Sequence, residues 1–295
     1  MKILITGGAG FIGRHLISSL SKNHSITIYD DLSNSTKPDF ENVEFVKGDI
    51  LDYENLVKSS KGFDMIIHLA AKSNVAESVI HPDETMNVNV KGTENILKCC
   101  LQNEIKKIIF ASSAAVYGEC NDIITEETKT NPLSPYGESK LLAENKIKSF
   151  AQENDLDAVI LRMFNVYGNG QNDQYAGVIT KFSNNILQNI PLKIYGDGKQ
   201  TRDFISIHDV VESFHHALEN ISGKKGTIYN IGTGIATTIA QLAKLMLEIS
   251  GKNLEINYVG EKKEDIKYSV ADITLAKKEL GFVAKTKLKE GLTKI

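Results

Sequence analysis

A tyrosine precedes a lysine by four residues at three places in this chain of 295 residues. Such a pair could serve as a general base, because a nearby ammonium favours the ionised form of a phenol. Chance alone produces roughly one such spacing in a chain of this composition, so other features must select among them. The pairs are Tyr136–Lys140, Tyr195–Lys199 and Tyr258–Lys262.

The sequence around Tyr136 is the only one of the three that favours a helix. Ser134 can cap the N-terminus of a helix, and Pro135 suits its first position. The second pair brackets the turn sequence GDG, and the third contains Gly260 after a strand-like run. Residues four apart on a helix are neighbours on one face, so we expect Tyr136 and Lys140 to act together.

Short apolar, β-branched runs separated by helix-like stretches must position this pair. The runs are continuous rather than alternating, which is typical of strands buried on both faces. Their alternation with helices predicts a Rossmann-type, doubly wound parallel sheet in an α/β fold. The expected strands are KILIT (near residue 2), SITIYD (25), VEFVKGD (43), MIIHLAA (65), KIIFASS (107) and AVILRMF (158), and the expected helices span 12–21, 87–103 and 136–154.

The pattern changes after residue 165, where the glycine- and asparagine-rich segment VYGNGQNDQYAG begins. Helices are expected at 177–189 and at about 237–250, with short strands around LKIYGDG, DFISI and TIYNIG. This mixture indicates a smaller mixed α/β lobe set over the edge of the sheet.

The first expected strand runs into the glycine-rich sequence TGGAGFIG. Gly8, Gly10 and Gly13 satisfy the spacing G-x-G-x-x-G, and Gly7 adds a second spacing. These glycines permit a tight turn and a close approach of the backbone to a pyrophosphate at the helix N-terminus. A position between a strand and a helix is the context that makes this pattern a strong predictor of dinucleotide binding.

Acidic residues end the second and third strands. Asp30, with Asp31 beside it, lies about 20 residues past the glycines, where a carboxylate binds ribose hydroxyls and repels a 2′-phosphate. The nearest downstream base is Lys37 and no arginine is in range, so NAD is favoured over NADP. Asp49 is a candidate for the adenine edge, although a plain strand-end cap would look the same.

Composition excludes several classes of function. A net charge of −3 and a pI near 6.2 give no electrostatic footprint for nucleic acid. No apolar run approaches the ~20 residues needed to span a membrane, and Met1 leads directly into a strand-like segment, so we expect no secretory signal. Cys99, Cys100 and Cys120 lack metal-ligand spacing, which predicts buried or half-buried thiols, no metal site and a reducing cytoplasm.

Several motifs together resemble a known family. The glycine turn, SSAAVYG, Tyr-x-x-x-Lys and LRMFNVYG are similar to those of extended short-chain dehydrogenases/reductases. More narrowly, the chain resembles NAD-dependent sugar-nucleotide epimerases of the UDP-glucose 4-epimerase type. The resemblance continues through HLAAKSNVAESV, NVNVKGT, GDGKQTRDFISIHDV and DIKYSVADITLAKKELG, and so covers nearly the whole chain. It implies an NAD-binding Rossmann domain at 1–165 and 203–233 and a UDP-sugar-binding lobe at 166–202 and 234–295.

The resemblance implies catalytic and cofactor-binding roles. Tyr136 would be the base, Lys140 would bind the nicotinamide ribose and lower the pKa of the tyrosine, and Ser113 would contact the sugar oxygen. Ser112 is the alternative for the last role, and Asn89 could instead be a helix-surface residue. The residues implied for NAD are Gly7, Gly10, Phe11, Ile12, Gly13, Asp30, Asp31, Asn34, Asp49, Ile50, Leu69, Ala70, Ala71, Lys72, Asn89, Tyr136 and Lys140.

The residues after Ser113 narrow the reaction. They are Ala114 and Ala115, where related dehydratases carry an acidic pair and UDP-glucuronate decarboxylases usually carry a glutamate. Alanines cannot supply a second acid and base. The expected reaction is therefore redox-neutral inversion at carbon 4 of a UDP-hexose through a 4-keto sugar, with NAD held as a prosthetic group.

On the substrate side, the resemblance implies that Asn165 and Arg202 hold the UDP diphosphate. Alternatively, Arg202 forms a surface salt bridge with Asp203. Ser269 stands where family members restricted to plain hexoses often carry tyrosine, which predicts room for an N-acetyl group. The full substrate set is Ser113, Tyr136, Asn165, Val178, Tyr195, Arg202, Asp265 and Ser269, and Lys262 replaces a second arginine found in many relatives.

Other interpretations stay open at this point. The same scaffold supports UDP-glucuronate 4-epimerases and NAD-dependent nucleotide-sugar reductases, and a regulator that senses NAD without catalysis is a different class. His68 lies inside an expected buried strand and is interpreted as a hydrogen-bonded core residue rather than a catalytic one. The resemblance also implies a homodimer formed through the helices near 87–103 and 136–154.

Overall fold

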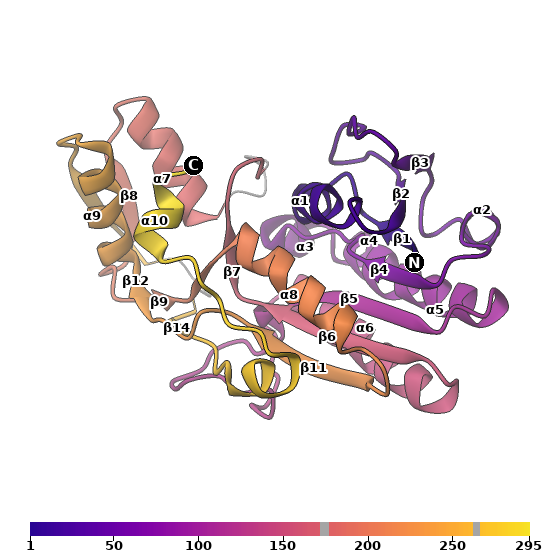
Figure 1. The fold of residues 1–295 in the computed structure, drawn as a ribbon. Coiled ribbons are helices and arrows are strands. Elements are labelled where there is room, and N and C mark those ends of the chain that lie inside the picture. The colour runs from indigo at the N-terminus through magenta and orange to yellow at the C-terminus, as the bar shows by residue number, and fades with distance from the viewer. Residues whose placement is uncertain (172–176, 262–265) are drawn as a thin grey trace.

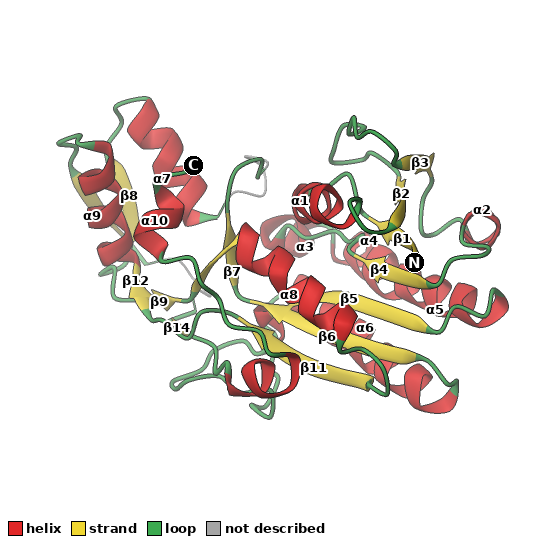
Figure 2. Ribbon diagram, viewed as in Figure 1, coloured by secondary structure: helices red, strands yellow, loops and turns green. Residues whose placement is uncertain are grey.

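A computed structural model describes residues 1–171, 177–261 and 266–295 of the chain. Within these residues, a seven-stranded sheet has the order β11-β6-β5-β4-β1-β2-β3, and every neighbouring pair in it is parallel (Figure 2). The predicted Rossmann-type α/β fold is confirmed. The strands are β1 (Lys2–Thr6), β2 (Ser25–Asp30), β3 (Glu44–Lys47), β4 (Met65–His68), β5 (Lys107–Ser113), β6 (Asp157–Met163) and β11 (Lys225–Ile231).

Helices cover both faces of this sheet because each strand is apolar on both sides. In β1, Ile3 and Ile5 pack in one core cluster with helices α1 and α8, while Leu4 packs in a second cluster on the opposite face. The helices are α1 (Phe11–Leu20) and α8 (Ile207–Glu219) on the first face, α2 (Tyr53–Ser59), α5 (Gly92–Gln102) and α6 (Pro135–Glu153) on the second, and the short α3 (Val75–Ile80) and α4 (Pro82–Met86) beside α6.

A smaller mixed α/β lobe lies beside the sheet and has a core of its own (Figure 1). Strand β7 (Asn165–Tyr167) pairs in parallel with β10 (Phe204–Ser206) where the two parts meet. Leu280 and Phe282 pack in the core of the large sheet, although they come late in the chain. The lobe contains α7 (Val178–Leu187), β8 (Leu192–Tyr195), β9 (Thr201–Arg202), β12 (Thr237–Thr238), α9 (Ile239–Ser250), β13 (Ile256–Val259), β14 (Tyr268–Ser269) and α10 (Leu288–Leu292).

The helix predicted over 87–103 is wrong in its first turn. A π-helical turn at Asn87–Lys91 precedes α5, and the hydroxyl of Thr93 in α5 donates to the carbonyl oxygen of Asn89 in that turn at 2.6 Å. Such wide turns are frequent at functional sites. Apolar periodicity does not distinguish a π-turn from an α-helix, so the sequence showed no sign of it.

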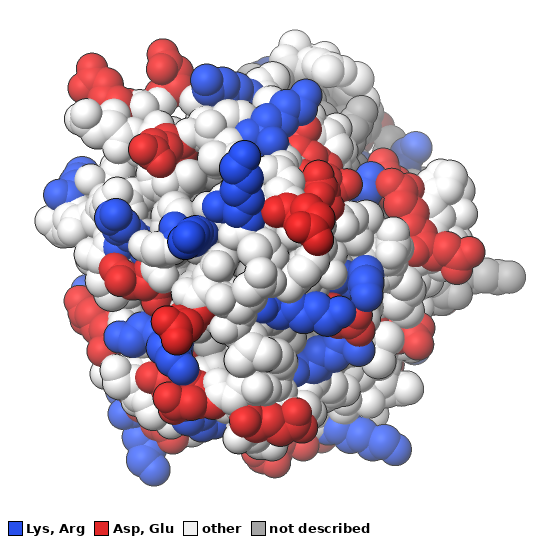
Figure 3. All heavy atoms as spheres, turned by 90° about the vertical axis from the view of Figure 1, so that its right-hand side faces the viewer, with Lys and Arg blue, Asp and Glu red and all other residues white. Residues whose placement is uncertain are grey.

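The charge pattern of the surface and the state of the cysteines agree with the composition. On the face shown in Figure 3, acidic and basic side chains are interspersed. Cys99 and Cys100 are buried free thiols and Cys120 is half-buried and free, as predicted. Among the described helices, none is long and apolar enough to cross a membrane. Within the same residues, no group of three or more His, Cys, Asp or Glu side chains could hold a metal ion.

Candidate active site

A cavity of about 1190 Å³ runs along the carboxyl ends of the parallel strands, from the glycine turn to the start of α6. Ligands of open parallel sheets bind at this edge. The cavity brings together residues that are far apart in the chain. The predicted site residues that line it are Gly7, Gly10, Phe11, Ile12, Gly13, Asp30, Asp31, Asn34, Asp49, Ile50, Leu69, Ala70, Ala71, Lys72, Ser113, Tyr136, Lys140 and Asn165.

The glycine turn fits the pyrophosphate of a dinucleotide. Gly7 has a φ of +70°, and a Cβ atom on it would lie 2.5 Å from the amide nitrogen of Ala70. A Cβ atom on Gly13 would lie 2.5 Å from the carbonyl oxygen of Gly8, so only glycine permits this packing of α1. Gly10 caps α1 without a side chain and lines the cavity, which leaves the helix N-terminus open to phosphate oxygens.

Asp30 joins the glycine turn to the loop after β2. One carboxylate oxygen accepts a hydrogen bond from the Ala9 amide at 3.0 Å. The other accepts from the Leu32 amide at 2.9 Å and from the Ser35 hydroxyl at 3.2 Å. The carboxylate lies at the cavity wall, where the lone pairs left over can accept the hydroxyls of a ribose.

Asp49 makes the hydrogen bond of a strand-end cap and also lines the cavity. Its Oδ1 accepts a 2.8 Å hydrogen bond from the Leu51 amide, as a strand-end cap does. It also lines the cavity beside Ile50, so it lies where the adenine edge is expected.

Helix α6 begins as predicted, with Ser134 as its cap and Pro135 in its first turn. The Ser134 hydroxyl accepts a hydrogen bond from the Gly137 amide at 3.1 Å. A second hydroxyl, that of Ser78 in α3, accepts from the Tyr136 amide at 3.1 Å. These two bonds fix the first turn of α6, and with it the half-buried Tyr136 ring at the cavity wall.

Lys140 lies one turn further along α6 and is only 3% exposed. Its ammonium donates a 2.9 Å hydrogen bond to the Ala111 carbonyl oxygen at the end of β5 and lies 4.7 Å from the centre of the Phe110 ring. Burial lowers the pKa of Lys140 to about 8, an effect that the carboxylate of Glu144 partly offsets. At neutral pH the Lys140 side chain is therefore still mostly an ammonium, and its hydrogen bond holds it in place at the cavity wall.

Ser113 lies next to the candidate base. Burial raises the pKa of Tyr136, and the hydrogen bond with the Ser113 side chain lowers it by a smaller amount. The Ser113 oxygen also accepts from the Ala115 amide at 3.2 Å, which fixes the hydroxyl at the start of a short 3-10 turn. Tyr136, Ser113 and Lys140 thus all line the same cavity.

Ser112 differs from Ser113 in its hydrogen-bond partner. Its hydroxyl donates to Glu144 at 2.5 Å and is almost fully buried. Glu144 in turn forms a buried ion pair with Arg162, with the Nη2 to Oε2 distance at 2.6 Å. The Arg162 guanidinium stacks 4.7 Å from the centre of the Tyr117 ring. Ser112 therefore belongs to a buried polar network and also lines the cavity, and Ser113 stays the predicted contact to the sugar oxygen.

His68 is a hydrogen-bonded core residue, as predicted. It is fully buried, with Nδ1 at 2.7 Å from the Thr6 hydroxyl and Nε2 at 3.0 Å from the Thr93 hydroxyl. Since the Thr93 proton goes to the carbonyl of Asn89, the Thr93 oxygen accepts from Nε2. Burial and the nearby Lys140 charge lower the pKa of His68 to about 3, so the ring stays neutral.

Asn89 lies behind the cavity wall, which corrects both interpretations of it. It is 2% exposed, so it is not a helix-surface residue. Its Oδ1 accepts from the Lys72 amide at 2.8 Å, and its Nδ2 donates to the Lys72 carbonyl at 3.0 Å and to the Ser139 hydroxyl at 2.8 Å. The amide is occupied by protein, and it fixes the loop that carries Lys72 against α6. Lys72 lines the cavity and forms a 2.7 Å ion pair with Glu84.

Four of the predicted substrate residues lie in the lobe and do not line this cavity: Val178, Tyr195, Arg202 and Ser269. Arg202 and Ser269 are register partners in the strands β9 and β14. Val178 begins α7, and Tyr195 ends β8 and is exposed. Asn165 lines the cavity, together with Val166, Gly170 and Gly177. Asp265 and Lys262 lie outside the described residues.

The predicted alternative for Arg202, a surface salt bridge with Asp203, is wrong. Asp203 is fully buried, and its carboxylate accepts hydrogen bonds from the Thr233, Gly234 and Ala271 amides. The Arg202 guanidinium instead donates to backbone carbonyls, including that of Thr201 at 3.0 Å.

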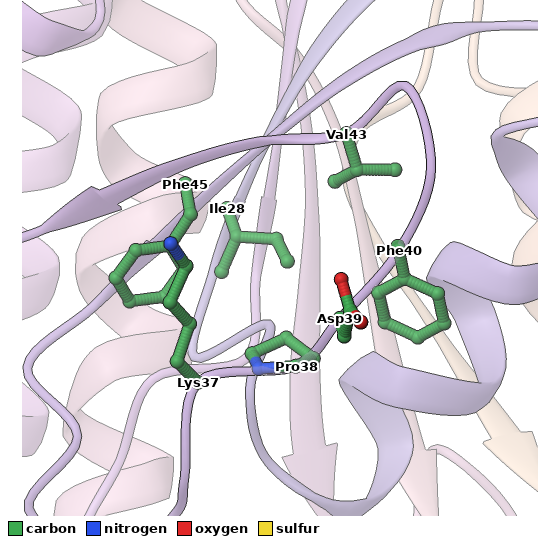
Figure 4. A pocket seen from close by; sticks show the side chains of 7 residues that line it. All are labelled: Ile28, Lys37, Pro38, Asp39, Phe40, Val43 and Phe45. Atoms are coloured by element: carbon green, nitrogen blue, oxygen red, sulfur yellow. The ribbon is translucent and has the colours of Figure 1, made fainter.

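Sequence reasoning missed Arg14, which lines the nucleotide end of the cavity. Lys37, the nearest base downstream of Asp30 in the sequence, is not among the residues that line this cavity. Figure 4 shows that Lys37 points instead across a separate cavity of about 160 Å³, toward Phe45. Its ammonium lies 5.4 Å from the centre of that ring. The signal for Arg14 is its position directly after the last glycine of the turn.

Comparisons with known proteins agree with this geometry. Residues 3–232 match the model of the NAD dependent epimerase/dehydratase family. The fold is similar to the crystal structure of UDP-glucose 4-epimerase from Thermotoga maritima with UDP-glucose (TM-score 0.94, 35% identity, covering 99% of this chain and 96% of that one). It is equally similar to UDP-N-acetylglucosamine 4-epimerase from Methanobrevibacter ruminantium in complex with UDP-N-acetylmuramic acid (TM-score 0.94, 35% identity, 99% and 96% covered). The human dTDP-D-glucose 4,6-dehydratase is 33% identical over an alignment of 314 positions, which covers 99% of this chain and 88% of that protein.

Proposed function

Since the chain belongs to the NAD-dependent epimerase/dehydratase family, we propose that it inverts carbon 4 of a UDP-hexose without net oxidation or reduction. The observation that carries this proposal is that Tyr136, its neighbour Ser113 and Lys140 line one cavity, which continues to a dinucleotide-type glycine turn. UDP-glucose and UDP-galactose are the proposed pair.

The cofactor proposed for this cavity is NAD. Asp30 would accept the adenosine ribose hydroxyls, the N-terminus of α1 would hold the pyrophosphate, and Lys140 would bind the nicotinamide ribose. Bound NAD supplies a hydride acceptor that later returns the same hydride. Because the reaction is redox-neutral, the cofactor can stay bound through every turnover.

The residues of the chain supply the proton chemistry. Tyr136 as a phenolate takes the proton of the sugar 4-hydroxyl, while Ser113 donates a hydrogen bond to the same oxygen. Burial alone raises the pKa of Tyr136, so the base needs positive charge beside it to ionise. Lys140 carries such a charge into the site. In the second half of the reaction Tyr136 would return the proton to the same oxygen.

Ala114 and Ala115 favour an epimerase over a dehydratase. Removal of water across carbons 5 and 6 needs a further acid and base beside the keto sugar, and methyl groups provide neither. The family contains both activities, and the human dehydratase is among the relatives, so this distinction matters.

Substrates with an N-acetyl group are proposed as well. Ser269 is a small residue next to Arg202 in the lobe, and it would leave space near carbon 2 of the hexose. The similar methanogen structure is named a UDP-N-acetylglucosamine 4-epimerase, which supports the proposal.

A homodimer and a cytoplasmic setting are also proposed. Exposed Leu101 in α5 and Leu142 in α6 support the homodimer, and the free cysteines support the cytoplasmic setting.

An isotope experiment tests the mechanism. UDP-glucose deuterated at carbon 4 is converted by the purified protein, and the UDP-galactose formed is analysed by deuterium NMR. We expect the deuterium to remain at carbon 4, because the hydride leaves and returns within one site. Loss of deuterium to solvent would contradict the internal return. A product oxidised or reduced in stoichiometric amounts would favour a dehydrogenase or reductase, and no reaction would favour UDP-glucuronate or a non-catalytic NAD sensor.

A further inference from the structure

Arg14 connects two segments that form the nucleotide end of the cavity. Its Nε donates a 2.7 Å hydrogen bond to the carbonyl oxygen of Ala9 in the glycine turn. Its Nη2 donates to the Thr36 hydroxyl at 3.1 Å and to the Thr36 carbonyl oxygen. In Figure 1 the loop between β2 and β3 lies next to α1, and this guanidinium joins the two.

Asp30 makes the same connection from the other side. The Ala9 amide donates to its carboxylate, which also accepts from the Leu32 amide and the Ser35 hydroxyl. The residue Ala9 is therefore tied to the loop twice, through its N–H by Asp30 and through its carbonyl by Arg14. Ala9, Arg14, Asp30, Ser35 and Thr36 all line the cavity.

We propose that Arg14 is a cofactor-retention residue, which clamps the loop at 31–36 onto the glycine turn and so slows the release of the adenosine end of the dinucleotide. This inference rests on the proposed function for the identity of the dinucleotide as NAD. The role is one of positioning. The guanidinium fixes the loop that carries the ribose-binding side of the cavity, so the site is ordered before the ligand arrives.

The fork shape of the guanidinium is what the arrangement requires. One nitrogen reaches the carbonyl of Ala9 while another reaches Thr36, so a single planar group spans the turn and the loop. A lysine carries the same charge but has one donor atom at the end of a flexible chain. Arg14→Lys therefore separates the clamp from a plain attraction between a cation and the phosphates.

Lys37 offers a matched control in the same loop. It is the neighbour of Thr36, it is a cation, and its ammonium lies over the Phe45 ring rather than at the nucleotide cavity. Lys37→Ala removes one positive charge close to Arg14 without removing a bond of the clamp.

The test measures the release of radiolabelled NAD from the loaded protein into an excess of unlabelled NAD, with no sugar nucleotide present. We expect release about 10- to 100-fold faster in both Arg14→Lys and Arg14→Ala, since charge-assisted hydrogen bonds to the loop are lost. Release from Lys37→Ala should match that from the unchanged protein. Release at the unchanged rate in Arg14→Lys would overturn the clamp, whatever Arg14→Ala does.

Amide hydrogen exchange in the cofactor-free proteins gives a second readout. We expect faster exchange in the peptide covering residues 31–40 of Arg14→Lys, while peptides from β5 and β6 exchange as before. Unchanged exchange in the loop would contradict the proposal. If the unchanged protein bound no NAD, the proposed cofactor would fail, and the exchange comparison would still decide whether Arg14 holds the loop. If Arg14→Ala did not fold, Arg14→Lys would decide alone.

Discussion

The ammonium of Lys140 donates a 2.9 Å hydrogen bond to the backbone carbonyl of Ala111, two residues before Ser113 at the end of β5. This contact joins the helix that carries the candidate base to the strand that carries the candidate hydroxyl. Any movement of α6 along the sheet would separate Tyr136 from Ser113. The position of Tyr136 relative to Ser113 is thus held by a buried charge, and burying that charge lowers the free energy of unfolding.

Lys140→Met should stabilise the cofactor-free protein at pH 7. Burial lowers the pKa of Lys140 from its ordinary 10.5 to about 8, which corresponds to roughly 3 kcal/mol against the charged folded state. The unfolded chain binds more protons between these values, so the stability of the unchanged protein rises with pH from about 8 to 10.5.

Urea unfolding at pH 7 should therefore give a free energy of unfolding about 1 to 3 kcal/mol higher for Lys140→Met, with part of the gain lost with the hydrogen bond to Ala111. The difference should shrink toward pH 10.5, where Lys140 is neutral in the folded state. A variant less stable at pH 7, or a difference that does not vary with pH, would contradict the buried charge.

Tyr136→Phe should lower kcat for the conversion of UDP-glucose by about 10²- to 10⁴-fold, because a general base is removed. The ring, its packing and the capped start of α6 stay in place, so bound NAD and the circular dichroism spectrum should not change. Activity of the unchanged protein should rise with pH as the phenol ionises, because burial raises the pKa of Tyr136. If the variant kept a tenth of the activity, another base would have to be sought.

Ser113→Ala should mainly lower activity and Ser112→Ala should mainly lower stability, although the two residues are adjacent. Ser113 lies at the Tyr136 hydroxyl, and its loss should lower kcat about 10- to 100-fold with little change in stability. Ser112 donates to a buried carboxylate, and its loss should cost about 1 to 3 kcal/mol in the free energy of unfolding. Steady-state kinetics and chemical unfolding of both variants check this. The reverse pattern would give the ligand role to Ser112.

Glu144→Gln should be the most destabilising of these changes, by about 3 to 5 kcal/mol, because it leaves the Arg162 guanidinium buried without a counter-charge. It should also lower the pKa of Lys140 further, since Glu144 is the group that raises it. Glu94→Gln is a matched control, because that carboxylate pairs with Lys146 and Lys91 at the surface. Its expected cost is below about 1 kcal/mol. If both variants lost the same free energy of unfolding, the buried Glu144–Arg162 pair would matter no more for stability than a surface pair.

Ser269→Tyr should narrow the substrate range. A phenol beside Arg202 would fill the space proposed for the N-acetyl group, so kcat/KM on UDP-N-acetylglucosamine should fall at least about tenfold relative to UDP-glucose. Ser269→Thr, a smaller change at the same buried position, should keep both activities. If Ser269→Tyr lowered kcat/KM equally for both substrates, the proposed specificity role of Ser269 would be wrong.

Much of the site follows from local sequence. The glycine turn, the Ser134 cap and the spacing of Tyr136 and Lys140 are each encoded within a few residues, and strand–helix alternation brings them to one sheet edge. These are the features on which the structure agrees with the sequence.

The features that were not predictable depend on contacts between distant segments. Asn89 reaches Lys72 and Ser139, and Arg14 reaches Thr36, through side chains whose direction no periodicity specifies. The π-turn before α5 has the same apolar pattern as an α-helix. The lobe side was also harder to predict, because Arg202 and Ser269 meet only through the pairing of the short strands β9 and β14.

The most direct test of the account is a proton NMR time course of UDP-glucose with the purified protein and no added NAD. We predict that the anomeric signal of UDP-galactose appears and grows to a constant ratio, without any keto product, and that conversion by Tyr136→Phe is at least about 10²-fold slower. Absence of conversion even after NAD is added would contradict the proposed epimerase. The appearance of a 4-keto-6-deoxy sugar nucleotide would show that the chain removes water despite Ala114 and Ala115.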